Sequence, residues 1–390
     1  MNNTKFYYLY SILSTTALSF FNPILYIYLL SKDFSFTEVG LYLSIFWLVS
    51  FMTELPCGAI TDNIGAKNSI LLSGIFRVVG LILLLSNSLI LLYISAILSA
   101  IAESFQSGTL TSWLVNVNNK NNEEIDIDKV LSRSSLYSLF FSAVIGFISA
   151  KYVYVYFKSL SIILSMSIFI ISFLFTYLFM KKLEQTQKIS IENLKGSIVT
   201  VKNSLKETLY VKSSVFLMIL FVIPSILDLG PSNQWQAVFE KLDADIIGYV
   251  WVGISVSGML GSVIYEKLSK LRILYFFVIV NLGMLLMFIF IQNVYAKFIL
   301  FMLFIVFFTL MSIQVNVFMH KYLVKSDENR TTTVSIFYTF ESIIVAILLS
   351  VNGVLTDKVG IENTWLVFIG MIGLVILSFM LVKLKKSRIK

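Results

Sequence analysis

The chain alternates long apolar runs with short polar interruptions. Cutting the sequence at these interruptions leaves twelve apolar segments, near residues 6–30, 37–60, 69–86, 89–115, 132–156, 159–180, 213–237, 246–265, 273–291, 297–320, 332–355 and 363–384. A helix needs roughly 20 apolar residues to cross a bilayer, and the segments are close to that length. A transmembrane barrel is excluded, because its strands of about 10 residues would alternate polar and apolar positions. The pattern therefore predicts an all-α membrane protein with twelve transmembrane helices.

Composition points to lipid as the solvent of much of the surface. Apolar residues make up 57% of the 390 positions and charged residues 13%, whereas an ordinary globular domain is about 25% charged. The single cysteine, Cys57, excludes an intrachain disulfide and a cysteine-based metal site. The single histidine, His320, removes most nucleophile–base pairs and histidine metal sites. We therefore expect no catalytic residue, no metal and no cofactor, and we expect the protein not to be an enzyme.

The basic residues predict the orientation. If the N-terminus is cytoplasmic, 24 of the 30 lysines and arginines fall in cytoplasmic segments, as the positive-inside rule requires. Both termini are then cytoplasmic. The formal charge of +8 follows from this topology and from anionic lipid, so no nucleic-acid partner is expected. Richness in Lys, Asn and Ile is typical of an AT-rich bacterial genome, which favours a bacterial cell membrane.

One polar loop is long and divides the chain. Residues 181–212 separate the sixth and seventh segments, and their apolar residues recur at steps of three and four, at Ile191, Leu194, Ile198, Val201, Leu205 and Leu209. This spacing fits an amphipathic helix lying on the inner membrane surface, with a plain solvated linker helix as the alternative. We expect a six-helix bundle at 1–180, this linker, and a second six-helix bundle at 213–390.

The two halves share weak internal similarity. Three pairs of positions match in order, at separations close to half the chain length: Pro23 with Pro224, Asp62 with Glu266, and Arg133 with Arg330. The last pair opens "RSSLYSLFFS" and "RTTTVSIFYT", whose hydroxyl, apolar and aromatic positions agree. Repeats of this kind are common in transporters, which bind substrate at the repeat interface near the bilayer midplane. The similarity predicts two bundles related by a pseudo-two-fold axis.

A polar stretch, "ELPCGAITDNIGAKNS", interrupts the apolar pattern at residues 54–69. We interpret "GAITDNIGAK" as a tight turn between the second and third helices, where Gly58 permits close packing and Gly65 supplies a backbone conformation that other residues avoid. Asp62 is expected at the start of the third helix, where a carboxylate is stabilised. The stretch is not a phosphate-binding loop, which needs glycine, four residues and then Gly-Lys-Ser/Thr.

These residues resemble the major facilitator superfamily, which carries Gly-x-x-x-Asp-(Arg/Lys)-x-Gly-(Arg/Lys)-(Arg/Lys) in this loop. The pattern is matched at Gly58, Asp62, Gly65 and Lys67, and departs at Asn63 and Ala66, where basic residues are lost. "ELP" and the later "ESFQSGTLTSWL" (103–114) are similar to the drug:proton antiporter branch of the family. The resemblance implies two six-helix bundles and a loop that acts as a conformational switch. The arginine that these antiporters often carry in helix four is missing.

Four carboxylates fall inside the predicted spans: Glu54, Glu103, Asp228 and Glu341. No lysine or arginine is expected comparably deep. A charge at the centre of a membrane helix costs about 2.5–3.5 kcal/mol by insertion scales, so such residues usually face a cavity and serve function. Burial disfavours the charged form of a carboxyl group, so protons can bind and leave under working conditions. All four are candidate proton-coupling residues, and each alternatively satisfies polar groups of a neighbouring helix.

Six further polar residues are candidates for lining a substrate cavity: Asn22, Gln106, Gln234, Trp235, Gln314 and Asn316. Each alternatively makes a hydrogen bond between helices, which is worth about 0.6 kcal/mol on average in membranes.

We therefore expect a secondary transporter that works by alternating access. The favoured activity is proton-coupled efflux of a small amphiphilic or cationic compound, with the proton gradient as energy source. Its expected partners are that compound, protons and the bilayer, and the protein is expected to be monomeric. Import of a neutral nutrient or sugar is the alternative. A membrane-embedded transferase and an ATP-driven permease subunit are less favoured, because His320 has no acid within six residues and the duplication is typical of secondary transporters.

Overall fold

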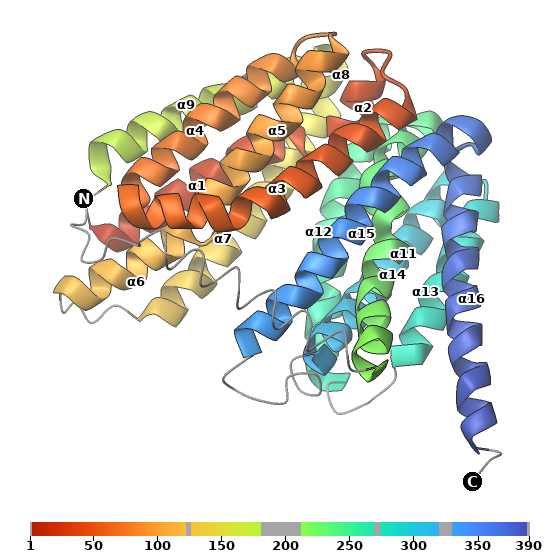
Figure 1. Ribbon diagram of the computed structural model, residues 1–390. Coiled ribbons are helices and arrows are strands. Elements are labelled where there is room, and N and C mark those ends of the chain that lie inside the picture. The colour runs from red at the N-terminus through yellow and green to blue at the C-terminus, as the bar shows by residue number, and fades with distance from the viewer. Residues whose placement is uncertain (1, 122–125, 181–211, 269–273, 320–329, 388–390) are drawn as a thin grey trace. The chain divides into compact units, whose positions relative to one another are not determined.

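The computed structural model describes residues 2–121, 126–180, 212–268, 274–319 and 330–387, and these residues form helices and short connections without any strand (Figure 1). The helices are α1 (Asn3–Phe21), α2 (Leu25–Leu30), α3 (Phe36–Ile64), α4 (Ala66–Leu84), α5 (Leu89–Gln106), α6 (Thr109–Asn121), α7 (Ile127–Ile148), η1 (Ser149–Val153), α8 (Tyr154–Tyr156), α9 (Leu160–Phe179), α11 (Lys212–Leu242), η2 (Ala244–Ile246), α12 (Ile247–Leu268), α13 (Leu274–Phe290), α14 (Val294–Phe318), α15 (Arg330–Val359) and α16 (Ile361–Ser387). The predicted linker helix at 181–212 and His320 lie outside the described residues, apart from Lys212.

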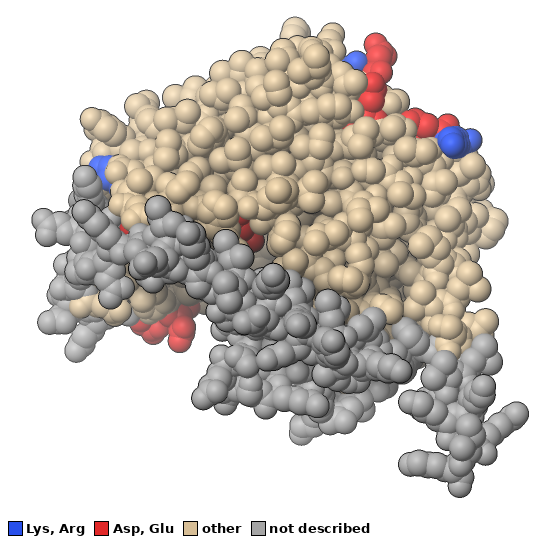
Figure 2. All heavy atoms as spheres, in the orientation of Figure 1, with Lys and Arg blue, Asp and Glu red and all other residues tan. Residues whose placement is uncertain are grey.

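Helices lie over every predicted apolar segment, and two segments are interrupted. Pro23 separates α1 from α2, and Ser107 with Gly108 separates α5 from α6. Within the described residues nine helical stretches are long and apolar enough to cross a membrane, and Phe276–Phe290 is a shorter apolar helix. On the face in Figure 2, acidic and basic side chains occupy only a few spots of the described surface. The structure thus has the all-helical, lipid-compatible character that the sequence predicts, while the count of twelve crossings stays a prediction.

The chain packs into two compact units. The first unit comprises Met1–Phe34, Leu41–Thr200 and Ala244–Val252, and the second unit comprises Ser35–Gly40, Val201–Asp243 and Gly253–Lys390.

In the first unit α1 packs against α7 and α9, and α4 packs against α5 and α9. The ring of Phe6 lies 5.2 Å from both Trp113 and Phe175, measured between ring centroids. Small residues bring α4 and α5 together, since a Cβ on Gly80 would lie 2.8 Å from Ser99 Oγ. Ser95 Oγ in turn donates to the carbonyl oxygen of Gly80 at 2.8 Å. Glycine and serine at such seams let membrane helices approach closely.

In the second unit α11 packs against α14, α15 and α16, and α13 packs against α14. Its core includes Phe221 and Phe337, whose rings meet edge to face at 5.7 Å. Lys297, in the first turn of α14, is 1% exposed. Its Nζ lies 2.5 Å from a carboxylate oxygen of Glu362 in α16, which neutralises the buried ammonium.

The start of α3 belongs to the second unit and is capped by α15. Ser35 and Glu38 form a reciprocal capping box, with Ser35 N–H donating to Glu38 Oε2 at 2.7 Å and Glu38 N–H to Ser35 Oγ at 3.2 Å. The N–H groups of Phe36 and Thr37 donate to the carboxylate of Asp357 at 3.0 and 2.7 Å. Asp357 therefore satisfies donors that a helix N-terminus leaves without intrahelical partners.

Candidate functional site

The first unit contains a partly buried ion pair between α4 and α5. Arg77 Nη2 donates to Glu103 Oε2 at 2.5 Å, and the exposed fractions of the two side chains are 4% and 47%. The expectation that no basic residue lies as deep as the acids was wrong, because Arg77 lies midway along the predicted segment 69–86. The guanidinium group also lies over the ring of Phe169, 5.8 Å from its centroid.

The packing of α4 on α5 fixes the geometry of this pair. Ser73 Oγ donates to the carbonyl oxygen of Ala102 at 2.7 Å, and Ser69 Oγ donates to that of Phe105 at 3.0 Å. Both hydroxyl groups lie on the face of α4 that carries Arg77. The carbonyl oxygen of Phe105 lies in the last turn of α5, where intrahelical donors run out, and that of Ala102 lies just before it.

Gln106, a predicted cavity residue, lies at the end of α5 beside the ion pair. Its Nε2 donates to Ser14 Oγ on α1 at 2.8 Å. With Arg77, Tyr10 and residues of α9 it lines a cavity of about 10 Å³. That volume holds about one water molecule. The first unit thus brings together Glu103 and Gln106, which the sequence predicts as site residues, and Arg77, which the sequence analysis missed.

Two of the predicted acids lie in the second unit. Glu341 of α15 accepts a hydrogen bond from Ser225 Oγ of α11, and among the described residues it has no ion pair with a basic group. Asp228 lies one turn beyond Ser225 in α11, and its Oδ1 is buried without a hydrogen-bond partner in the described part of the chain. Through Ser225, Glu341 therefore contacts the helix that carries Asp228. In the described part of the chain neither acid forms an ion pair with an arginine or lysine, unlike Glu103.

Asn316, a predicted cavity residue, extends this polar region to α14. Its Oδ1 accepts a hydrogen bond from the hydroxyl group of Tyr338 at 3.1 Å. Tyr338 lies three residues before Glu341 in α15, so both side chains lie on one face of that helix. Gln314, two residues earlier in α14, is buried.

Gln234 belongs to a different, closed network in the second unit. It is 0% exposed, donates from Nε2 to Thr356 Oγ1 at 2.9 Å, and accepts from Trp365 Nε1 at 2.8 Å. Trp235 is likewise buried. These contacts fit the alternative interpretation of Gln234 as a link between helices.

Two other predicted site residues are exposed. Asn22 forms the C-terminal end of α1, where its backbone N–H donates to Leu18 O at 2.9 Å. Glu54 lies on an exposed stretch of α3, next to Thr53, whose hydroxyl is 2.8 Å from Ser104 Oγ. Within the first unit neither residue lines the cavity that Arg77 and Gln106 share.

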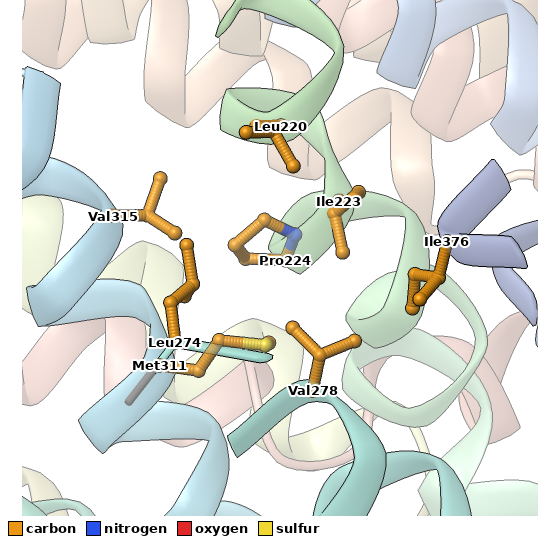
Figure 3. A pocket seen from close by; sticks show the side chains of 8 residues that line it. All are labelled: Leu220, Ile223, Pro224, Leu274, Val278, Met311, Val315 and Ile376. Atoms are coloured by element: carbon orange, nitrogen blue, oxygen red, sulfur yellow. The ribbon is translucent and has the colours of Figure 1, made fainter. Parts of the chain in front are cut away.

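An apolar pocket lies beside the proline of α11 (Figure 3). Its walls come from α11, α13, α14 and α16, and the side chains in the figure are Leu220, Ile223, Pro224, Leu274, Val278, Met311, Val315 and Ile376. The pocket volume is about 10 Å³. Pro224 lies inside α11, and proline cannot donate the backbone hydrogen bond of a helix interior. The pocket offers no polar group to a substrate, and apolar voids of this kind stay dry.

The motif at 58–67 forms a sharp turn, but Asp62 does not begin a helix. α3 continues to Ile64, Gly65 has a φ of 86°, and α4 begins at Ala66. Asp62 therefore lies in the last turn of α3, where the helix dipole gives a carboxylate no support. The bond across the turn joins Thr61 Oγ1 to Ser69 Oγ at 2.6 Å.

Lys67 and Gly58 are the other two matched positions of the motif. Lys67 Nζ donates to the carbonyl oxygen of Tyr177 on α9 at 2.7 Å. A Cβ on Gly58 would meet no described atom within 4 Å, so the close packing expected there is not seen among the described residues.

Most of the chain matches the model of one known protein family. The model of the Major Facilitator Superfamily matches residues 7–347. The chain belongs to this superfamily. Its members are generally secondary transporters of small molecules across membranes, and the superfamily assignment agrees with the resemblance found in the loop motif.

Relatives of known sequence or structure agree with this assignment. An uncharacterized MFS-type transporter, YxaM of Bacillus subtilis (strain 168), is 27% identical over 255 residues, which cover 63% of this chain and 61% of the relative. The chain thus spans about three fifths of that relative. Two crystal structures of the nucleoside transporter NupG, the second of a point mutant, superpose with TM-scores of 0.80 and 0.79 at 15% and 14% identity. Each covers 97% of this chain and 98–99% of the other chain. At such identity the likeness shows a common fold.

The superfamily motif supports one prediction about Asp62. Asp62→Asn should slow interconversion of the transport states, because the superfamily motif implies a switch role for this aspartate. The protein should stay folded, because the side chain is exposed and engages no described partner. Turnover in proteoliposomes, measured beside substrate binding at equilibrium, checks this. Wild-type turnover would remove Asp62 from the switch.

Proposed function

We propose that this superfamily member couples the inward movement of protons to the export of a small amphiphilic or cationic compound, with Glu341 as the residue that binds and releases the proton. The observation that carries the proposal is the contrast between the acids. Arg77 neutralises Glu103 at 2.5 Å, whereas Glu341 has a hydroxyl partner, Ser225, and no described ion pair.

This contrast assigns different tasks to the acids. The charge of the Glu103 carboxylate is already balanced by the guanidinium group of Arg77, so no uncompensated charge remains there for a proton to neutralise. A carboxyl group that a neutral hydroxyl contacts in a membrane span lacks that balancing charge, and protonation removes the cost of a buried charge. Glu341, with Asp228 one turn from its partner Ser225, is therefore the better proton carrier.

The charge balance favours a cationic substrate. Glu54, Asp228 and Glu341 lie in apolar helices without a described basic partner, whereas Arg77 and Lys297 are each paired with an acid. Import of a neutral polar solute is the second candidate. The uncharged pairs Gln106–Ser14 and Tyr338–Asn316 favour it, since they offer hydrogen-bond donors and acceptors without net charge.

Transport of a fluorescent cation tests the proposal. Cells that produce the protein should accumulate less ethidium than cells with an empty vector, and the difference should disappear when an uncoupler collapses the proton gradient. In proteoliposomes with an acidic lumen, antiport should drive ethidium into the lumen. Greater accumulation in the cells would favour import, and transport that ignores the pH gradient would contradict proton coupling.

A further inference from the structure

Arg77 has a second hydrogen-bonding group that the ion pair does not use. Its side chain is 4% exposed, and its Nη2 donates to Glu103. Its Nε is also buried, and this group has no hydrogen-bond partner among the described residues. Arg77 is one of the residues that line the cavity of about 10 Å³ in the first unit. A buried donor without an acceptor is costly, so Nε requires an acceptor within that cavity.

Three other residues that line the cavity present acceptor oxygens to it: Ser73, Gln106 and Thr176. The hydroxyl hydrogen of Ser73 is donated to Ala102 O at 2.7 Å. That of Thr176 is donated at 2.8 Å to a carbonyl oxygen one turn earlier in α9. Gln106 Nε2 donates to Ser14 Oγ at 2.8 Å. A hydroxyl oxygen whose hydrogen is donated, and an amide oxygen, both still accept hydrogen bonds. The cavity therefore combines one N–H donor with several acceptors.

This combination fits a single water molecule better than an ion. A water molecule accepts from Nε of Arg77 and donates to two of the oxygens, which gives the about three hydrogen bonds typical of buried water. The cavity also has the volume of about one water molecule. A cation would be repelled by the guanidinium group. An anion would meet acceptor oxygens, and Glu103 already balances the charge of Arg77. The lining thus selects a neutral ligand that both donates and accepts.

We propose that this cavity is the binding site of one ordered water molecule, which positions Arg77 by bonding to its Nε. With Thr176 and Gln106 as its acceptors, the water joins α4 to α9 and to the end of α5, the two helices on which α4 packs. The guanidinium group is then held at Nε by the water and at Nη2 by Glu103. The site does not depend on which compound is transported. It therefore goes beyond the proposed function and is tested separately from it.

Hydroxyl-radical footprinting of the full chain in nanodiscs tests the site, because X-rays generate radicals from an ordered water that oxidise the side chains beside it. Phe169 and Phe368 are a matched pair, since they are 5% and 4% exposed and each lines a cavity of about 10 Å³. The residues around the cavity of Phe368 are apolar apart from Trp365, whose indole N–H is bonded to Gln234. Apolar cavities stay dry. Phe169 should therefore be oxidised several-fold faster than Phe368, and equal rates would overturn the proposal.

Variants of the lining show whether Arg77 and Thr176 hold the water. Arg77→Met removes the N–H donor and should lower the oxidation of Phe169 to the rate of Phe368. Thr176→Val is nearly isosteric, removes one acceptor and should also slow the oxidation of Phe169, which covers the case in which Arg77→Met does not fold. Oxidation of Phe169 at the wild-type rate in either folded variant would refute the assignment. Ser95→Ala is the control, because Ser95 bonds α5 to α4 at 2.8 Å without lining the cavity. It should leave the oxidation of Phe169 unchanged.

Heavy-oxygen water distinguishes a bound water molecule from bulk solvent that reaches the cavity. When the protein is mixed with this water just before irradiation, Tyr156, which is 82% exposed, should incorporate the heavy isotope at once. Phe169 should continue to incorporate ordinary oxygen for longer, because the bound water exchanges only past the half-buried side chain of Gln106. Incorporation of heavy oxygen at both residues on the same timescale would show a cavity open to solvent, and the ordered site would be excluded.

Discussion

Gradient-driven transport is expected to fall to background in a Glu341→Gln variant that still folds and reaches the membrane. Glutamine keeps the shape of the side chain, and its amide oxygen can still accept the hydrogen bond from Ser225 Oγ. The variant therefore preserves the contact between α11 and α15 and removes only the capacity to bind and release a proton. The measurement is ethidium uptake into proteoliposomes with and without an imposed pH gradient.

Exchange at equal pH separates loss of coupling from loss of transport. Glutamine imitates a permanently protonated glutamate, so exchange of labelled for unlabelled ethidium across the membrane should continue in Glu341→Gln. Loss of both activities would point to a damaged fold, and gradient-driven uptake at the wild-type level would exclude Glu341 as the proton carrier. Asp228→Asn is the informative companion, because loss of coupling there alone would transfer the role to Asp228.

Asp33→Asn provides the matched control. It also neutralises a carboxylate, but Asp33 lies between α2 and α3, outside the apolar helices. Its φ of 64° is a conformation that asparagine tolerates as well as aspartate. Transport by this variant should match the wild type, which shows that removal of one negative charge does not by itself abolish coupling.

The helices could be predicted well because apolar runs follow directly from the cost of placing polar groups in lipid. Even the interruptions carry a local signal, since Pro23 and Gly108 stand where α1 and α5 end. The helix boundaries on either side of Gly65 depend on its backbone conformation, a φ of 86°, and the sequence predicted them less well. The sequence motif suggested that Asp62 opens the third helix, whereas α3 continues past it to Ile64.

The sequence pattern alone does not pair the ions, because each pair joins residues on different helices. Arg77 and Glu103 are 26 positions apart, and Lys297 and Glu362 are 65 apart. A signal for the first pair was nevertheless present. Arg77 stands in the middle of an apolar segment, where an unpaired arginine would be costly, so a nearby acid in the next segment was to be expected. Glu103, the acid in the middle of that segment, meets this requirement.

The largest effect on stability is expected from Gly353→Ala in α15. Gly40 of α3 and Gly353 of α15 lie where the two helices cross, and a Cβ on Gly40 would lie 2.7 Å from the carbonyl oxygen of Leu349. A Cβ on Gly353 would overlap the carbonyl oxygen of Phe36, a backbone atom that cannot rotate away. Overpacking of this kind costs about 1–3 kcal/mol. It would also pull Asp357 from the N–H groups of Phe36 and Thr37, and loss of a cap costs about 1 kcal/mol.

The apparent melting temperature should therefore fall by several degrees, since about 1 kcal/mol shifts it by roughly 2–4 °C in a domain of 150–250 residues. Cys57, the only cysteine of the chain, is buried, so a thiol-reactive fluorophore reports unfolding of the purified protein. Gly370→Ala is the matched control, because a Cβ there meets no described atom within 4 Å. Both substitutions add the same helix propensity, so the difference between them isolates the crossing of α3 and α15. Equal melting temperatures for the two variants would show that this close crossing does not stabilise the protein.

The melting temperature of Asp357→Asn should lie between those of Gly353→Ala and Gly370→Ala. Asparagine offers one acceptor oxygen, whereas the carboxylate of Asp357 offers two, one to Phe36 and one to Thr37.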